Sequence, residues 1–143
     1  NKIDVGSFSV SAGVSYTGTS SFNESLVNDL SWYPQANGSV SYCFKPFGLT
    51  AGMYYKYNGK VPVYVLDSNG NSLKQTNEDY QLLDITVSKK IWKDRIEIGG
   101  GLKNIFNVTD VRRFSTGEIH SGGSSSSSLL PGRLFFLKLS VNI

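Results

Sequence analysis

Ser7-Phe8-Ser9-Val10-Ser11-Ala12-Gly13-Val14-Ser15-Tyr16 alternates apolar side chains with small or hydroxyl-bearing ones. Successive side chains of an extended strand point to opposite sides, so this stretch has one apolar face and one hydroxyl-rich face. Such a strand suits a sheet with hydrocarbon on one side and water on the other, which is the arrangement of an outer-membrane barrel wall. The stretch therefore predicts an all-β fold that crosses a membrane with strands.

The same alternation recurs along the chain and predicts about six antiparallel transmembrane strands. The expected strands cover about residues 3–17, 39–44, 49–65, 83–88, 96–103 and 135–143. Polar loops are expected at 18–34, 67–79 and 109–129, and short turns at 45–48 and 92–95. Long loops that alternate with tight turns are typical of outer-membrane barrels, whose turns face the periplasm and whose loops face outside. Pro62 lacks a backbone N–H and indicates that the third strand leaves the membrane there.

Length and composition restrict the remaining classes of protein. The 143 residues correspond to one domain, and no apolar run exceeds four residues, which excludes a transmembrane helix. Residues 1–143 begin within the alternating pattern and without a signal peptide, so we expect a segment of a longer protein. The net charge of +3 comes from scattered basic residues, which argues against a nucleic-acid partner. The single cysteine, Cys43, cannot form an internal disulfide and is interpreted as a small space-filling side chain.

The composition of the polar face separates a membrane barrel from a soluble one. A soluble ligand-binding barrel would direct its apolar side chains inward and carry many Lys and Glu residues outside, whereas this polar face is mostly Ser, Gly and Thr. A few charged residues fall on the same face and are expected to project into the lumen. They are Asp84, Glu97, Lys103 and Lys138.

Five side chains in or beside the expected outer loops are candidate contacts for an extracellular ligand. They are Trp32, Tyr33, Arg112, Arg113 and His120. The two aromatic residues can stack on a flat ligand or anchor the chain at the membrane interface, and the anchor is the more frequent role. The two arginines can bind carboxylates or phosphates, but arginines at the base of a loop are more often simply exposed to solvent. The lone histidine has no second ligand at metal spacing, so we expect no metal or haem site.

The segment 67–78 has the ligand spacing of a calcium loop. Its first, third, fifth and twelfth positions are Asp67, Asn69, Asn71 and Glu78. Ser72 stands at the sixth position, where the sharp turn needs glycine, so we predict no calcium site. Serine is abundant, but no Gly-x-Ser-x-Gly turn and no positioned histidine accompany it. We therefore expect no enzyme activity and no cofactor.

Three stretches of the C-terminal half resemble one known family. Residues 101–110, Gly-Leu-Lys-Asn-Ile-Phe-Asn-Val-Thr-Asp, resemble the penultimate-strand signature of TonB-dependent outer-membrane receptors, which has an Asn-Leu-Phe-Asn/Asp core. Residues 83–90 and 131–140 are similar to the strand before that signature and to the closing strand of the family. The loop sequences at 57–60 and 120–123 look most like those of receptors from the Bacteroidetes. The chain ends in Ile143, where the family usually has an aromatic residue.

The resemblance implies that residues 1–143 form the C-terminal part of a barrel of about 22 strands, with the plug domain and the remaining strands outside this chain. It also implies active import of a siderophore, haem, cobalamin or glycan, with energy relayed by TonB and with a surface lipoprotein as a possible partner. Two alternatives remain open at this point. One is a small structural or adhesive outer-membrane barrel, which needs at least about eight strands. The other is a soluble ligand-binding β-barrel.

Overall fold

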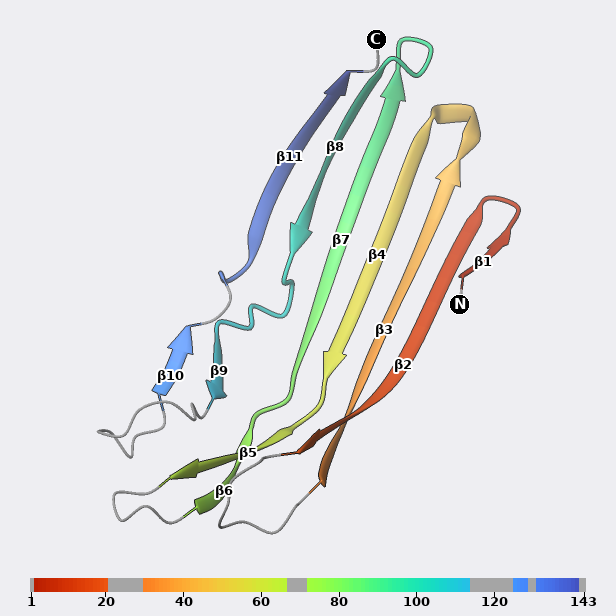
Figure 1. Cartoon of the computed structure of the whole chain (residues 1–143). Coiled ribbons are helices and arrows are strands. Elements are labelled where there is room, and N and C mark those ends of the chain that lie inside the picture. Colours follow the sequence, from red (N-terminus) through yellow and green to blue (C-terminus); the bar gives the residue numbers. More distant parts are fainter. Residues whose placement is uncertain (1, 21–29, 67–71, 114–124, 129–130, 142–143) are drawn as a thin grey trace.

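The computed structural model describes residues 2–20, 30–66, 72–113, 125–128 and 131–141, and these residues form strands and turns (Figure 1). The described part of the chain contains no α-helix, and a single 3₁₀ turn, η1 (Lys45–Phe47), joins two strands. The all-β prediction is therefore confirmed. Among the described residues, no helix has the length and apolar character needed to span a bilayer.

Seven antiparallel strands form one open sheet in the order β1-β2-β3-β4-β7-β8-β11. These strands are β1 (Lys2–Val5), β2 (Phe8–Ser20), β3 (Leu30–Phe44), β4 (Leu49–Asn58), β7 (Tyr80–Ile91), β8 (Ile96–Lys103) and β11 (Leu134–Val141). Two hairpins lie beyond one end of the sheet (Figure 1). They are formed by β5 (Val61–Leu66) with β6 (Ser72–Asn77), and by β9 (Asp110–Arg113) with β10 (Ser125–Ser128). We call this end the loop end and the opposite end the turn end.

The register of the sheet places the predicted apolar positions in continuous rows. One row crosses all seven strands, because each residue in it lies directly opposite the next on the neighbouring strand. It consists of Ile3, Val10, Val40, Met53, Ile85, Leu102 and Phe135. The adjacent row is small or polar from β2 to β8 and consists of Ser9, Ser41, Gly52, Thr86 and Gly101. Residues opposite one another point to the same side, so the sheet has one apolar face and one polar face.

The first predicted strand, 3–17, is wrong in one respect, because the structure divides it into the hairpin of β1 and β2. Gly6 at the turn has a φ of 62°, a left-handed conformation that glycine adopts without steric cost. Val5 lies opposite Phe8, so the apolar face continues across the turn although the apolar positions change from odd to even numbers.

The predicted loop 18–34 is also wrong at both ends, because β2 continues to Ser20 and β3 begins at Leu30. Residues 21–29 lie outside the described residues. Pro34 is accommodated within β3 because the ladder with β4 stops at the next residue, Gln35. The carbonyl of Pro34 accepts the N–H of Gly59 at 2.8 Å. Both backbone groups of a strand residue face the same neighbour, so the missing N–H of this proline falls at the end of that ladder.

The other two predicted loops contain strands. Residues 72–77 form β6, and residues 110–113 and 125–128 form β9 and β10. The predicted strand 49–65 is interrupted at Gly59 and Lys60, before Pro62, and its second half pairs with β6 instead of continuing the sheet. The two short turns at 45–48 and 92–95 are confirmed.

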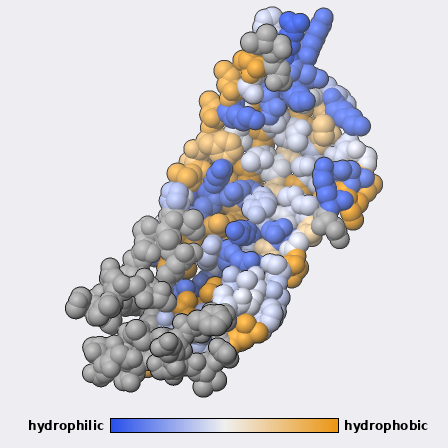
Figure 2. Space-filling model, in the orientation of Figure 1, coloured by the Kyte–Doolittle hydropathy of each residue, from blue (hydrophilic) through white to orange (hydrophobic). Residues whose placement is uncertain are grey.

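The described residues lack a hydrophobic core. Val111, in β9, is the one hydrophobic residue among them that is buried. Figure 2 shows pale and blue residues over the middle of the sheet in this view and orange residues along the margin near β11. The stability of this sheet therefore does not come from an apolar interior.

Candidate membrane-facing surface and loop-end site

The apolar face of the sheet is exposed over its whole width. Val14, on β2, is 84% exposed, and Phe135 and Leu137, on β11, are 82% and 84% exposed. Soluble monomers rarely expose a contiguous apolar patch larger than about 600 Å². A face that spans seven strands needs a cover, which is lipid or another layer of protein.

Aromatic residues concentrate at the two ends of this face. At the turn end, the Phe8 and Tyr42 rings lie 4.4 Å apart, and the Tyr42 and Phe44 rings lie 4.3 Å apart. At the loop end, Trp32 stacks on Tyr16 with ring centroids 5.5 Å apart and an angle of 7° between the planes. Aliphatic side chains occupy most of the zone between. They include Val10, Val14, Val40, Met53, Ile85, Val87, Leu137 and Leu139.

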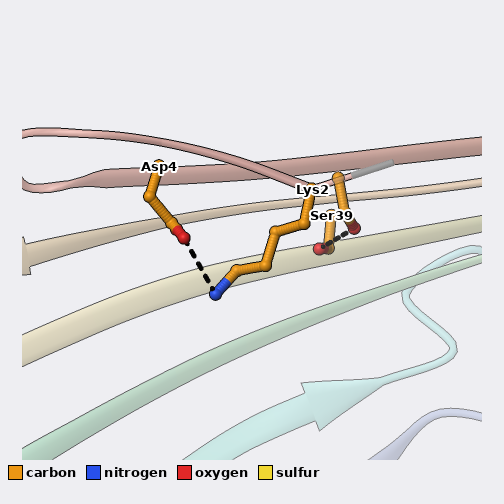
Figure 3. A network of polar contacts seen from close by, with 4 residues as sticks. Lys2, Asp4 and Ser39 are labelled. Atoms are coloured by element: carbon orange, nitrogen blue, oxygen red, sulfur yellow. Dashed lines mark hydrogen bonds and ion pairs between the residues drawn. The ribbon is translucent and has the colours of Figure 1, made fainter.

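The polar face carries small side chains and a few charged ones. The hydroxyls of Ser11 and Ser39 lie 2.7 Å apart, and Lys2 forms an ion pair with Asp4 at 3.3 Å (Figure 3). Lys138 forms a longer ion pair with Glu97 at 3.9 Å. The register also places Asp84 and Lys103 on this face, as the sequence predicted for these four charged residues. Their projection into a lumen remains a prediction, since the sheet is open.

Asn104 fixes the base of the segment that follows β8. Its side-chain amide donates to the carbonyls of Val108 at 2.8 Å and Pro131 at 3.2 Å, and its amide oxygen accepts the Val108 N–H at 2.9 Å. Its own backbone N–H donates to the Asp84 carboxylate at 2.8 Å. Asn104 is 7% exposed and has a φ of 53°, a left-handed conformation in which asparagine is enriched. This one residue thus links β7, β8 and the segment before β11.

Arg133 completes this cluster from the other side. Its backbone N–H donates to the Asn107 side-chain oxygen at 2.9 Å, and its guanidinium donates twice to the Ile105 carbonyl, at 2.8 and 3.2 Å. Residues 104–107, the core of the stretch that resembles the family signature, therefore form a hydrogen-bonded anchor at the base of the β9–β10 hairpin. Sequence reasoning identified the motif but not this role.

A groove of about 480 Å³ lies at the loop end, between the sheet and the segment that leads to β9. Its lining consists of Tyr55, Tyr57, Asp79, Tyr80, Gln81, Val108, Asp110 and Val111. The Tyr55 hydroxyl donates to Gln81 at 2.9 Å, and the Tyr57 hydroxyl donates to Asp79 at 3.4 Å. Sequence reasoning missed this groove, because its lining combines residues 55–57, 79–81 and 108–111, which are far apart in the sequence.

The structure separates the predicted ligand contacts. Trp32 and Tyr33 are neighbours in β3 and therefore point to opposite faces, Trp32 to the apolar one and Tyr33 to the polar one. Arg112 and Arg113 belong to β9, at the loop end. His120 lies outside the described residues, as do the calcium-spaced residues 67–71. The five candidates remain predictions.

A scan of protein-family models and searches of curated proteins and of solved structures give no match to this chain. Among the described residues, no group of three or more His, Cys, Asp or Glu side chains is placed to hold a metal ion. The functional argument therefore depends on the two faces of the sheet and on its loop end.

Proposed function

We propose that this sheet is part of the wall of an outer-membrane barrel, with its apolar face against lipid and its polar face toward an aqueous lumen. The observation that carries this proposal is the exposed aliphatic zone between two sets of aromatic residues. Outer-membrane barrels have an apolar band about 25 Å tall between aromatic girdles. Tyr and Trp are enriched at such interfaces because one end of each side chain is apolar and the other is polar.

The dimensions of the aliphatic zone agree with this role. A strand rises about 3.3 Å per residue, so the eight steps from Phe8 to Tyr16 on β2 cover about 26 Å along the strand. The steps from Trp32 to Tyr42 on β3 cover about 33 Å. At the tilt of about 40° usual for barrel strands, these lengths correspond to roughly 20 to 25 Å of bilayer.

The open edges of the sheet support a larger closed structure. The ladder ends at β1 on one side and at β11 on the other, among the described strands. In hydrocarbon each unpaired backbone group costs several kcal/mol, so strands span membranes only as closed barrels. We infer that further strands of the same receptor pair with both edges.

For the whole protein we propose a TonB-dependent importer of a scarce nutrient, with a siderophore, haem, cobalamin or glycan as cargo. This step depends on the resemblance of residues 83–90, 101–110 and 131–140 to that family. In this proposal the plug domain occupies the lumen on the polar face, TonB acts through the plug, and the loop end captures the ligand together with a surface lipoprotein. The gene upstream of the codon for Asn1 should encode a plug and the remaining strands. An upstream reading frame that lacks the plug and these strands would contradict the importer proposal and would favour a smaller barrel.

The membrane-wall proposal is tested by a matched pair of arginine substitutions on β11. Leu137 lies on the apolar face in the middle of β11, and Ser140 lies on the polar face opposite Glu97. Leu137→Arg should weaken insertion into phospholipid vesicles by about 2–4 kcal/mol, because arginine is costly at the bilayer midplane. Ser140→Arg should leave insertion unchanged, since its side chain meets water and a carboxylate.

The measurement is the fraction of the receptor that becomes protease-protected in vesicles after dilution from urea. Equal insertion of the two variants would contradict a lipid-facing role for the apolar face. A receptor that stays soluble without detergent would favour the soluble ligand-binding barrel.

A further inference from the structure

The loop-end groove combines aromatic rings with acceptor groups. Tyr55 and Tyr57 come from β4, Tyr80 begins β7, and Asp110 begins β9. Val111 is 2% exposed and closes one side of the groove, so the position of β9 there is fixed by packing. The volume of about 480 Å³ lies within the usual range for small-molecule sites, about 300 to 1,000 Å³.

The described residues of the groove lining carry charge of one sign. They include two carboxylates, Asp79 and Asp110, and no Lys, Arg or His. Both carboxylates are largely exposed, and they accept hydrogen bonds from the neutral hydroxyls of Tyr57 and Thr109. A concave surface lined by one sign of charge attracts ligands of the opposite sign.

The tyrosine rings favour the same kind of ligand. The face of an aromatic ring carries a partial negative charge and attracts a cation placed within about 6 Å of its centre. Sites that bind quaternary ammonium groups combine several such rings with carboxylates, because the cation is bulky and weakly hydrated. An anionic ligand would be repelled by the two carboxylates, and a neutral ligand would gain hydrogen bonds from them but no ionic attraction.

We propose that this groove binds an organic ammonium group, with Tyr55 and Tyr57 against the cation and Asp79 and Asp110 as counter-ions. The ligand is an alkylammonium ion, either as the headgroup of a lipid or as a free solute. Tyr55, Tyr57 and Gln81 lie on the apolar face of the sheet, at its loop-end margin. These three lining residues therefore point away from the polar face of the sheet.

The first experiment titrates the full receptor, in a nonionic detergent, with choline and with 3,3-dimethylbutan-1-ol. The alcohol has the shape of choline but no charge, so it separates charge from size. Choline should bind in a saturable manner, as detected by calorimetry, and the alcohol should bind at least about fivefold more weakly. Equal binding of the two probes, or no binding of choline, would overturn the proposal.

Variants locate the binding in the groove. Tyr57→Leu removes a ring and should lower the affinity for choline about two- to fivefold, whereas Tyr57→Phe keeps the ring and should retain most of it. Asp110→Asn keeps the shape and should lower the affinity about threefold. Glu97→Gln is the control, because Glu97 lies on the polar face near the turn end. If Glu97→Gln weakens binding as much as Asp110→Asn does, the site is elsewhere and the proposal fails.

The source of the ammonium group is settled by competition. Bilayer discs that contain phosphatidylethanolamine should displace choline if a lipid headgroup occupies the groove, and discs of phosphatidylglycerol alone should not. If neither disc displaces choline, the groove serves a free solute. The titration needs detergent only and does not depend on vesicle insertion, so its failure is distinguishable from failure of the membrane-wall proposal.

Discussion

Asn104 shows how a single side chain can position a loop. Its amide makes three hydrogen bonds to backbone groups of Val108 and Pro131, which are separated by more than twenty residues of the chain. Backbone groups at the end of a strand need such partners, because the ladder no longer satisfies them. The left-handed conformation at this position adds a second requirement, which asparagine and glycine meet better than alanine.

Substitution of Asn104 should separate these two requirements. We expect Asn104→Ala to lower the free energy of unfolding by about 3 kcal/mol, from lost hydrogen bonds and from the left-handed backbone. Asn104→Gly should cost about 1 kcal/mol less than that, since glycine adopts the conformation without a steric penalty. Urea unfolding of the full-length protein in detergent micelles measures both values.

The control for this series is Asn37→Ala, at an exposed position on the polar face of β3. Its unfolding free energy should stay within about 0.5 kcal/mol of the wild-type value. An Asn104→Ala variant as stable as the Asn37→Ala variant would mean that the hydrogen bonds around Asn104 contribute nothing to the loop base.

Within the sheet, glycines differ in how closely neighbouring atoms approach them. A Cβ atom added at Gly101, in β8, would collide with the Ile85 carbonyl oxygen and lie 2.9 Å from the Phe136 ring. A Cβ atom added at Gly38, in β3, would meet only the Ser11 carbonyl oxygen at 3.5 Å, an ordinary contact. Gly101 is therefore required where β7, β8 and β11 pack together, and Gly38 is not.

Gly101→Ala should lower the free energy of unfolding by about 2 kcal/mol, because backbone of β7 or the Phe136 ring must move. Gly38→Ala should leave stability unchanged or raise it by up to about 1 kcal/mol, since alanine restricts the unfolded chain. Urea unfolding midpoints of the two variants, compared under the same conditions, test this difference. Equal midpoints would contradict the close packing at Gly101.

The sequence predicted the faces of the strands better than their ends. Alternation identifies which side of a strand is apolar, and the cross-strand rows confirm that assignment for β2, β3, β4, β7, β8 and β11. The hairpin at Gly6 left a signal that was missed, since the apolar positions change from odd to even numbers there. A change of phase without an intervening loop is what a two-residue turn produces.

Other features depended on contacts that no local pattern records. Three of the four strands in the β5–β6 and β9–β10 hairpins are mostly polar, and the fourth, β5, is an apolar run without alternation. Such segments carry no alternating face that would predict their pairing. The groove exists because residues near 80 and residues near 110, which are far apart in the sequence, line it together. The anchor role of Asn104 has the same long-range origin.

At the scale of the molecule, the sheet is stabilised by its ladders and has no apolar interior, because the one buried hydrophobic residue among the described residues, Val111, lies outside it in β9. The two tryptophans lie at opposite ends of the apolar zone. Trp32 is stacked on Tyr16 at the loop end, and Trp92 is 71% exposed in the turn after β7. A lipid-facing wall places both side chains at the two interfaces of the bilayer and neither at its centre.

The depth of the tryptophans therefore tests the orientation of the whole sheet. The variants Trp32→Phe and Trp92→Phe each keep one of the two tryptophans of residues 1–143, in a protein whose tryptophans outside these residues are replaced by phenylalanine. In vesicles with lipids brominated near the glycerol backbone, both variants should lose more fluorescence than in vesicles with lipids brominated near the chain ends. Both should also retain their fold, because phenylalanine keeps an aromatic ring at each site. Strongest quenching from the bilayer centre, or no quenching of either variant, would place the apolar zone somewhere other than across a membrane.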